Sequence, residues 1–75
     1  MAEPAVRYIV RNLNRQAPNN RIEGKMWGAR GECEPPMKAA TDAFDRANDE
    51  QRLYGDPVVV EDTRGAVILL LPARG

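Results

Sequence analysis

The sequence has no histidine and a single cysteine, Cys33, among its 75 residues. A lone thiol cannot close a disulfide within the chain, and without histidine the usual zinc-binding sets cannot form. The longest apolar run, from Ala66 to Leu71, is far shorter than the roughly 20 residues that span a bilayer. We therefore expect no disulfide framework, no metal or cofactor site and no membrane span, and we expect a cytoplasmic location.

The chain also lacks an excess of charge of either sign. Eleven basic residues balance eleven acidic ones, so the formal net charge is zero. Electrostatic steering of the whole molecule toward nucleic acid is therefore absent. Hydrophobic residues make up 43% of the chain, which is too many for a disordered protein. At this length we predict one small globular domain over residues 1–75.

Segments typical of β-strands lie at both ends of the chain. Alternating and β-branched patterns predict strands at 6–13 and 21–29, and again at 58–60 and 66–71. Turn-forming residues separate the members of each pair, which indicates two hairpins.

A helical pattern lies between the two predicted hairpins. Apolar residues recur there at spacings of three and four, as expected for the buried face of a helix: Met37, Ala40, Ala43, Phe44 and Ala47. Pro36 suits a first helical turn, and Gly55 with Pro57 supplies the end. We predict one helix at about residues 36–54.

The expected fold class is α+β, a single small domain with the order β-β-α-β-β. In it, one helix packs on one face of a four-stranded antiparallel sheet. Strand 66–71 is apolar on both of its alternating faces, which is typical of a strand covered on both sides. One helix covers only one face, so a loop, a partner protein or a second copy should cover the other. Strand 66–71 is therefore a candidate homodimer contact.

The charges are distributed unevenly along the chain. Residues 1–31 carry six basic and two acidic side chains, whereas residues 32–62 carry three basic and nine acidic ones. We therefore predict a bipolar molecule with a basic first hairpin and an acidic helix.

Four acidic side chains of the predicted helix form a candidate partner-binding row. They are Asp42, Asp45, Asp49 and Glu50. Helical spacing brings them to neighbouring positions, where they could imitate the phosphates of a nucleic acid. The alternative is a solubilising face, partly neutralised by Arg46, which lies four residues from both Asp42 and Glu50. A metal site is disfavoured, because no loop wraps a cation.

The first hairpin offers a second candidate surface, for a partner or for nucleic acid. Its residues are Arg7, Arg11, Arg21, Lys25 and Trp27. Arginine binds phosphate and tryptophan stacks on bases, as in proteins that bind single strands. An ordinary solvated face is the preferred interpretation, because Glu23 interrupts the patch. Trp27 either faces outward or packs in the core, and core packing is the commoner fate of a lone tryptophan.

Catalysis has little support in the sequence. Cys33 has no histidine to activate it, and its acidic neighbours Glu32 and Glu34 disfavour the thiolate. No pair of acidic residues is marked as a desolvated pair across a cleft. We therefore expect a protein that is not an enzyme.

In its size, single helix, paired hairpins and opposed charges, the chain resembles the small phage-encoded anti-CRISPR proteins. The resemblance covers residues 6–72, through Tyr8-Ile9-Val10 to Ile22-Glu23-Gly24, the helix 37–55, and Val58-Val59-Val60 to Ala66-Val67-Ile68-Leu69. It implies a non-enzymatic inhibitor that evades host defence by binding a subunit of a CRISPR-Cas surveillance complex. The acidic row would then dock on a basic nucleic-acid channel.

The leading hypothesis from the sequence is a stoichiometric protein-binding inhibitor or adaptor that acts without turnover. Two alternatives stay open. One is a small nucleic-acid-binding module that uses the basic hairpin face, and the other is a homodimeric structural subunit joined through strand 66–71.

Overall fold

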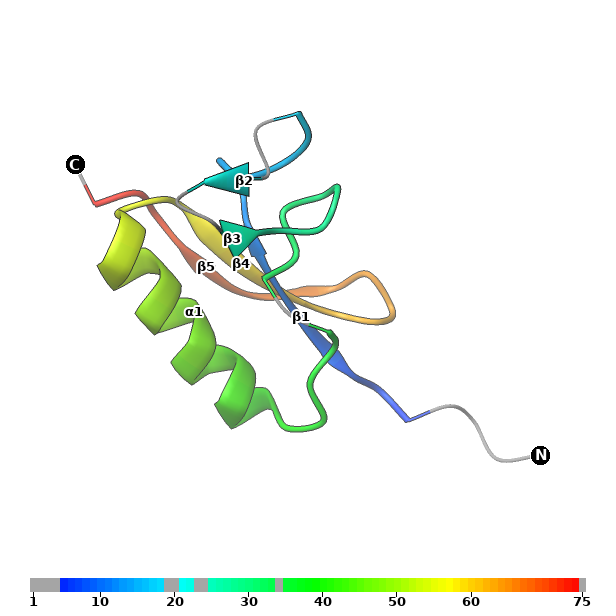
Figure 1. Ribbon diagram of the computed structural model, residues 1–75. Helices are drawn as coiled ribbons and strands as arrows, with labels where there is room; N and C mark the ends of the chain where they lie inside the picture. Colours follow the sequence, from blue (N-terminus) through cyan, green and yellow to red (C-terminus); the bar gives the residue numbers. More distant parts are fainter. Residues whose placement is uncertain (1–4, 19–20, 23–24, 34, 75) are drawn as a thin grey trace.

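The chain folds as a small α+β domain with one helix and a three-stranded antiparallel sheet (Figure 1). This computed structural model describes residues 5–18, 21–22, 25–33 and 35–74. In chain order the elements are β1 (Tyr8–Asn12), β2 (Arg21–Ile22), β3 (Lys25–Met26), α1 (Ala40–Tyr54), β4 (Val58–Asp62) and β5 (Val67–Leu71).

The main sheet has the strand order β1-β4-β5, with β4 in the centre. Val60 of β4 is the cross-strand neighbour of Val10 in β1 and of Leu69 in β5. The register of the β4–β5 pair shifts between Val60 and Glu61, which marks a bulge near the turn. The predicted C-terminal hairpin is therefore confirmed.

The turn between β4 and β5 is fixed by Asp62. Its carboxylate oxygen Oδ1 accepts hydrogen bonds from the backbone N–H groups of Arg64 and Ala66, both at 2.9 Å. Gly65 has φ of 94°, a left-handed conformation that glycine adopts without steric cost.

The predicted N-terminal hairpin is wrong, and so are the four-stranded sheet and the order β-β-α-β-β. In the described residues, β1 pairs with β4, and 21–22 pairs with 25–26 in a separate two-stranded sheet. The reason is that both edges of β1 are taken. On the edge away from β4, the backbone N–H of Cys33 donates to the carbonyl of Val10 and that of Met37 donates to Tyr8, at 2.8 and 2.7 Å.

Gly31 permits the chain to come this close to β1. Its φ is 85°, and a Cβ atom on it would collide with the carbonyl oxygen of Asn12. The N–H of Asn12 in turn donates to the carbonyl of Gly31 at 2.8 Å. A side chain at position 31 would therefore push residues 31–33 away from the edge of β1 that they close.

The predicted helix is confirmed at its C-terminal end and is shorter at its start. Gly55 follows α1 in the left-handed conformation, and its N–H donates to the carbonyl of Gln51 at 2.7 Å. The helix begins at Ala40 instead of near Pro36, because Met37 forms a β-bridge with Tyr8. Pairing with β1 therefore overrides the helical pattern of these residues.

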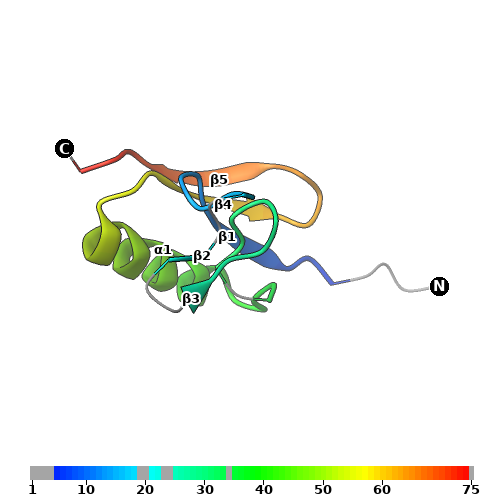
Figure 2. The same ribbon diagram turned by 45° about the horizontal axis from the view of Figure 1, so that its top comes forward.

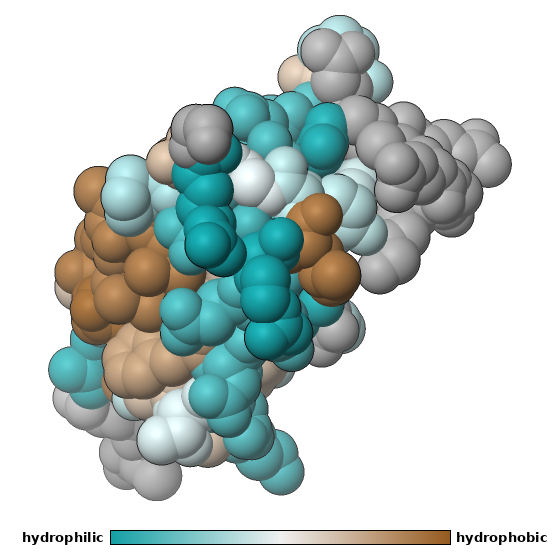
Figure 3. Space-filling model, turned by 90° about the vertical axis from the view of Figure 1, so that its left-hand side faces the viewer, coloured by the Kyte–Doolittle hydropathy of each residue, from teal (hydrophilic) through white to brown (hydrophobic). Residues whose placement is uncertain are grey.

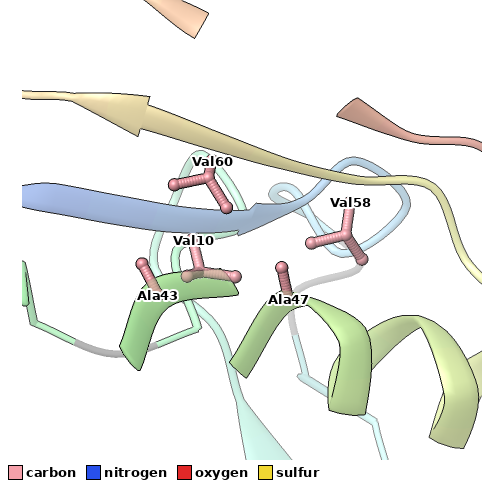
Figure 4. Packing of buried hydrophobic residues seen from close by; sticks show 5 residues of the cluster. All are labelled: Val10, Ala43, Ala47, Val58 and Val60. Atoms are coloured by element: carbon pink, nitrogen blue, oxygen red, sulfur yellow. The ribbon is translucent and has the colours of Figure 1, made fainter. Parts of the chain in front are cut away.

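The hydrophobic core lies between α1 and the sheet, and it is built from small side chains (Figure 4). Its buried members are Val10, Ala43, Ala47, Val58 and Val60. Alanines on the inner face of α1 let the helix lie close to the valines of β1 and β4. No leucine or isoleucine among the residues whose burial the structure describes is buried.

One face of the sheet is left without a covering layer. The β2–β3 hairpin lies on the same side of the sheet as α1 (Figure 2). On the other side, no helix or strand within the described ranges packs over β4 and β5. In the same part of the chain, no helix is long and apolar enough to cross a membrane.

Truncation of a core valine should be costly in spite of its small size. We expect Val60→Ala to lower the free energy of unfolding by about 2 kcal/mol, because Val60 is 0% exposed and sits in the centre of the sheet. Leu53→Ala removes more atoms from a side chain that is 61% exposed, and should change stability by less than about 0.5 kcal/mol. Urea unfolding of both variants tests the placement of the core, and similar losses would contradict it.

Candidate functional site

Glu50 of α1 is fully buried, although the sequence predicted it on an acidic surface row. Ala43, Ala47 and Glu50 follow one another at helical spacing, so Glu50 continues the buried face of the helix. Its carboxylate oxygen Oε1 accepts hydrogen bonds from the indole N–H of Trp27 at 2.8 Å and from the Asn12 amide at 3.2 Å. The other oxygen, Oε2, lies 3.4 Å from the guanidinium of Arg46.

A second buried carboxylate, Asp56, continues this network beyond the end of α1. The Asn12 amide donates to Asp56 Oδ2 at 3.1 Å, and the Asn14 amide donates to Oδ1 at 2.9 Å. The guanidinium of Arg15 lies 3.0 Å from Oδ2. Asn12 therefore bridges two carboxylates and joins the end of β1 to the segment between α1 and β4.

The guanidinium of Arg15 also contacts two aromatic rings. It lies 5.5 Å from the centroid of Trp27 and 5.8 Å from that of Tyr54. The two rings meet edge to face with centroids 5.6 Å apart. Such cation–π contacts stabilise a partly buried cation.

We refer to these side chains together as the polar cluster: Asn12, Asn14, Arg15, Trp27, Arg46, Glu50, Tyr54 and Asp56. Its charged groups are directed at one another instead of at an open cavity. No group of three or more potential metal ligands occurs in the described ranges. The arrangement is that of a structural network, which ties β1, the residue after β3 and the C-terminal end of α1 together.

The acidic row is only partly present at the surface. Asp42 and Asp45 are exposed on α1. Asp49 forms an ion pair with Arg52 at 2.6 Å, and Glu50 is in the interior. Asp42 and Asp45 thus remain exposed and form no ion pair within the described ranges, whereas the Asp49 side chain, 50% exposed, is paired with Arg52.

The basic hairpin face is not assembled as predicted. Trp27 is 3% exposed and cannot stack on a base. Arg11 forms an ion pair with Glu61 of β4, and Arg7, which precedes β1, is half-buried. The side chains of Arg21 and Lys25 lie outside the described part. Because β1 and β2 do not pair, these residues do not share one face of a hairpin.

The most exposed apolar side chains of the sheet are on β5. Val67 is 57% exposed, Ile68 38% and Leu70 61%. A broad hydrophobic area on one flank of the molecule is visible in Figure 3, on the side where β5 lies. We use the name β5 edge for the backbone of β5 on the side away from β4, together with the side chains of Val67, Ile68 and Leu70. Leu53, also 61% exposed, is on α1 instead.

The β5 edge is also the open edge of the main sheet. β5 is terminal in the order β1-β4-β5, and residues 31–33 with Met37 close the opposite edge along β1. Within the described ranges, nothing pairs with the outer side of β5. An edge strand presents unpaired backbone N–H and C=O groups, which here lie beside exposed apolar side chains.

Sequence reasoning found the β5 edge through one signal, the apolar residues on both alternating faces of 66–71. It missed the polar cluster. A glutamate in the apolar stripe of a helix, three residues after Ala47, was the available signal for Glu50.

Searches against protein-family models, curated proteins and solved structures gave no match for this chain.

Removal of the Glu50 carboxylate should destabilise the fold strongly. We expect Glu50→Ala to lower the free energy of unfolding by about 3 kcal/mol, because it removes the acceptor of the buried Trp27 indole N–H, one of the two acceptors of the Asn12 amide and the ion-pair partner of Arg46. Asp45→Ala, on the exposed side of the same helix, should cost less than about 0.5 kcal/mol. Trp27 is the single tryptophan, so its fluorescence measures the unfolding of each of the two variants. Equal losses would show that Glu50 is not a structural acceptor.

Proposed function

We propose that this protein acts by binding another protein chain through the β5 edge, without catalytic turnover. The observation that carries the proposal is the open edge of β5, where Val67, Ile68 and Leu70 are exposed. Strand addition at such an edge gives affinity through main-chain hydrogen bonds, and the neighbouring side chains give specificity.

β5 has a bulge near the turn, but it lacks the other common devices that keep an edge strand from pairing. Proteins protect such edges with charged side chains, with proline inside the strand or with a covering segment. Val67–Leu71 contains neither charge nor proline, whereas the opposite edge of the sheet is covered. An unprotected apolar edge beside a protected one supports a binding role for β5.

A narrower proposal is that the protein is a phage inhibitor that binds a CRISPR-Cas effector subunit in the bacterial cytoplasm. It rests on the size, single helix and opposed charges that the chain shares with anti-CRISPR proteins, although the predicted N-terminal hairpin is absent from the described residues, and on the two exposed carboxylates of α1, Asp42 and Asp45. Carboxylates on one side of a helix can occupy a basic channel that otherwise holds nucleic acid.

The nucleic-acid alternative has less support. Of its five residues, Trp27 is buried and Arg11 is neutralised by Glu61. Affinity that falls steeply with rising salt concentration would nevertheless favour it, because phosphate contacts release counterions.

The inhibitor proposal is tested with a double substitution on α1. We expect Asp42→Asn with Asp45→Asn to weaken binding to a purified CRISPR-Cas surveillance complex at least about tenfold, since each rim charge contributes on the order of 1 kcal/mol. Asp62→Asn is not a suitable control, because Asp62 holds a turn. Thr41→Ala, exposed on the same helix, serves instead. No binding by the wild-type protein, or equal binding by both variants, would contradict the inhibitor proposal.

The binding role of β5 is tested with a strand peptide. A synthetic peptide with the sequence of residues 66–71, flanked by lysines for solubility, should bind and perturb the amide resonances of β5. We expect Leu70→Lys to weaken this binding at least about tenfold, because a charge in an apolar contact must be desolvated. Leu53→Lys is the matched control, since both leucines are 61% exposed. Peptide binding that spares β5, or no binding, would contradict the proposed function.

A further inference from the structure

We propose that the chain bound at the β5 edge is a second copy of this protein, so that two three-stranded sheets join into one continuous antiparallel sheet. This inference rests on the proposed function, because it names the partner at the same edge. Three observations carry it: the charge pattern along β5, the covered edge of β1 and the position of the regular part of β5.

The charge pattern makes the β5 edge complementary to itself. No residue from Ala66 to Ala73 is charged, so two copies of this segment can meet without burying a charge. The exposed side chain of Leu70 then lies beside its counterpart, and Ile68 and Val67 lie beside the uncharged Pro72 and Ala73 of the second copy. A molecule with zero net charge also approaches its own copy without overall repulsion.

The covered edge of β1 limits the assembly to two copies. Cys33 and Met37 donate hydrogen bonds to β1, so residues 31–33 and Met37 close that edge. Only β5 is open in the described part of the sheet. Contact between identical edges is isologous and closes on itself, whereas a second open edge would let further copies add and form a fibre.

The regular part of β5 fixes the register of the contact. Leu69, Leu70 and Leu71 pair in order with Val60, Val59 and Val58, while the bulge lies nearer the turn. A two-fold axis at Leu70, the middle of this part, places Leu70 opposite its counterpart. With this axis, Leu69 and Leu71 of one copy face Leu71 and Leu69 of the other, so the regular parts of the two strands pair over their whole length.

The contact is small, which decides how it must be measured. A strand of five residues is about 17 Å long, so the interface belongs to the low end of specific interface sizes. We expect a dissociation constant in the micromolar range, and a dimer that forms as concentration rises.

Sedimentation equilibrium over a concentration series measures the mass directly. We expect the wild-type chain to reach twice its mass of 8.4 kDa, and Leu70→Lys to raise the dissociation constant at least tenfold. Leu53→Lys, at a leucine of equal exposure on α1, should dimerise like the wild type. Circular dichroism confirms that each variant is folded before its mass is interpreted.

Cysteine cross-linking tests the register. Directly opposed residues of an antiparallel pair have Cβ atoms about 5 Å apart, close enough for a disulfide. We expect Leu70→Cys to form a covalent dimer under mild oxidation, and Leu53→Cys to remain monomeric on a denaturing gel. Cys33 is present in both variants, so any cross-linking through it is the same in both.

The outcomes separate this inference from the proposed function. A wild-type chain that stays at 8.4 kDa but binds the strand peptide at β5 would overturn the inference that the partner is a second copy. The proposed function would stay in place. A dimer that Leu53→Lys breaks and Leu70→Lys does not would overturn the inference as well. A monomer that does not bind the peptide would overturn both.

Discussion

The buried carboxylate of Glu50 is the interaction on which the rest of this structure depends. It accepts hydrogen bonds from Trp27 and Asn12, and Arg46 lies beside it. These contacts attach the end of β1 and the chain that follows β3 to the helix. A buried ion that keeps all its partners is tolerated, whereas the loss of one partner is expensive. The Glu50 carboxylate therefore adds a polar connection to the N-terminal half, which the β1–β4 pairing and the small core also hold.

Small apolar side chains are buried in this domain, whereas several large ones are exposed to solvent. The buried members of the main core cluster are valine and alanine, and Phe44, Leu69 and Leu71 pack against it while partly buried. Leu70, Ile68 and Leu53 are exposed. Small domains bury a small fraction of their surface, and each exposed leucine forgoes stabilisation that burial would give. Association at the β5 edge recovers part of that burial. The exposed apolar side chains of β5 thus bear both on the stability of the domain and on its proposed function.

Local patterns in the sequence predicted the elements whose partners are near in the chain. The helix end at Gly55 and the hairpin around Asp62 follow from nearby residues, and both are confirmed. The partners of β1 could not be predicted in this way, because β4 lies about fifty residues away and Met37 had the pattern of a helix residue. The candidate functional site shows the same division between local and distant contacts. The apolar β5 could be identified from its own residues, whereas the burial of Glu50 depends on Trp27 and Asn12, which are distant in sequence.

The most direct test of the account is hydrogen exchange of the β5 amides that point away from β4, measured at two protein concentrations. In a lone molecule these amides face solvent and exchange fast. If the β5 edge joins two copies, their protection should rise with concentration, while amides in the β1–β4 pair stay unchanged. Protection that does not depend on concentration would contradict the claim that this edge is where the protein associates with its own copy.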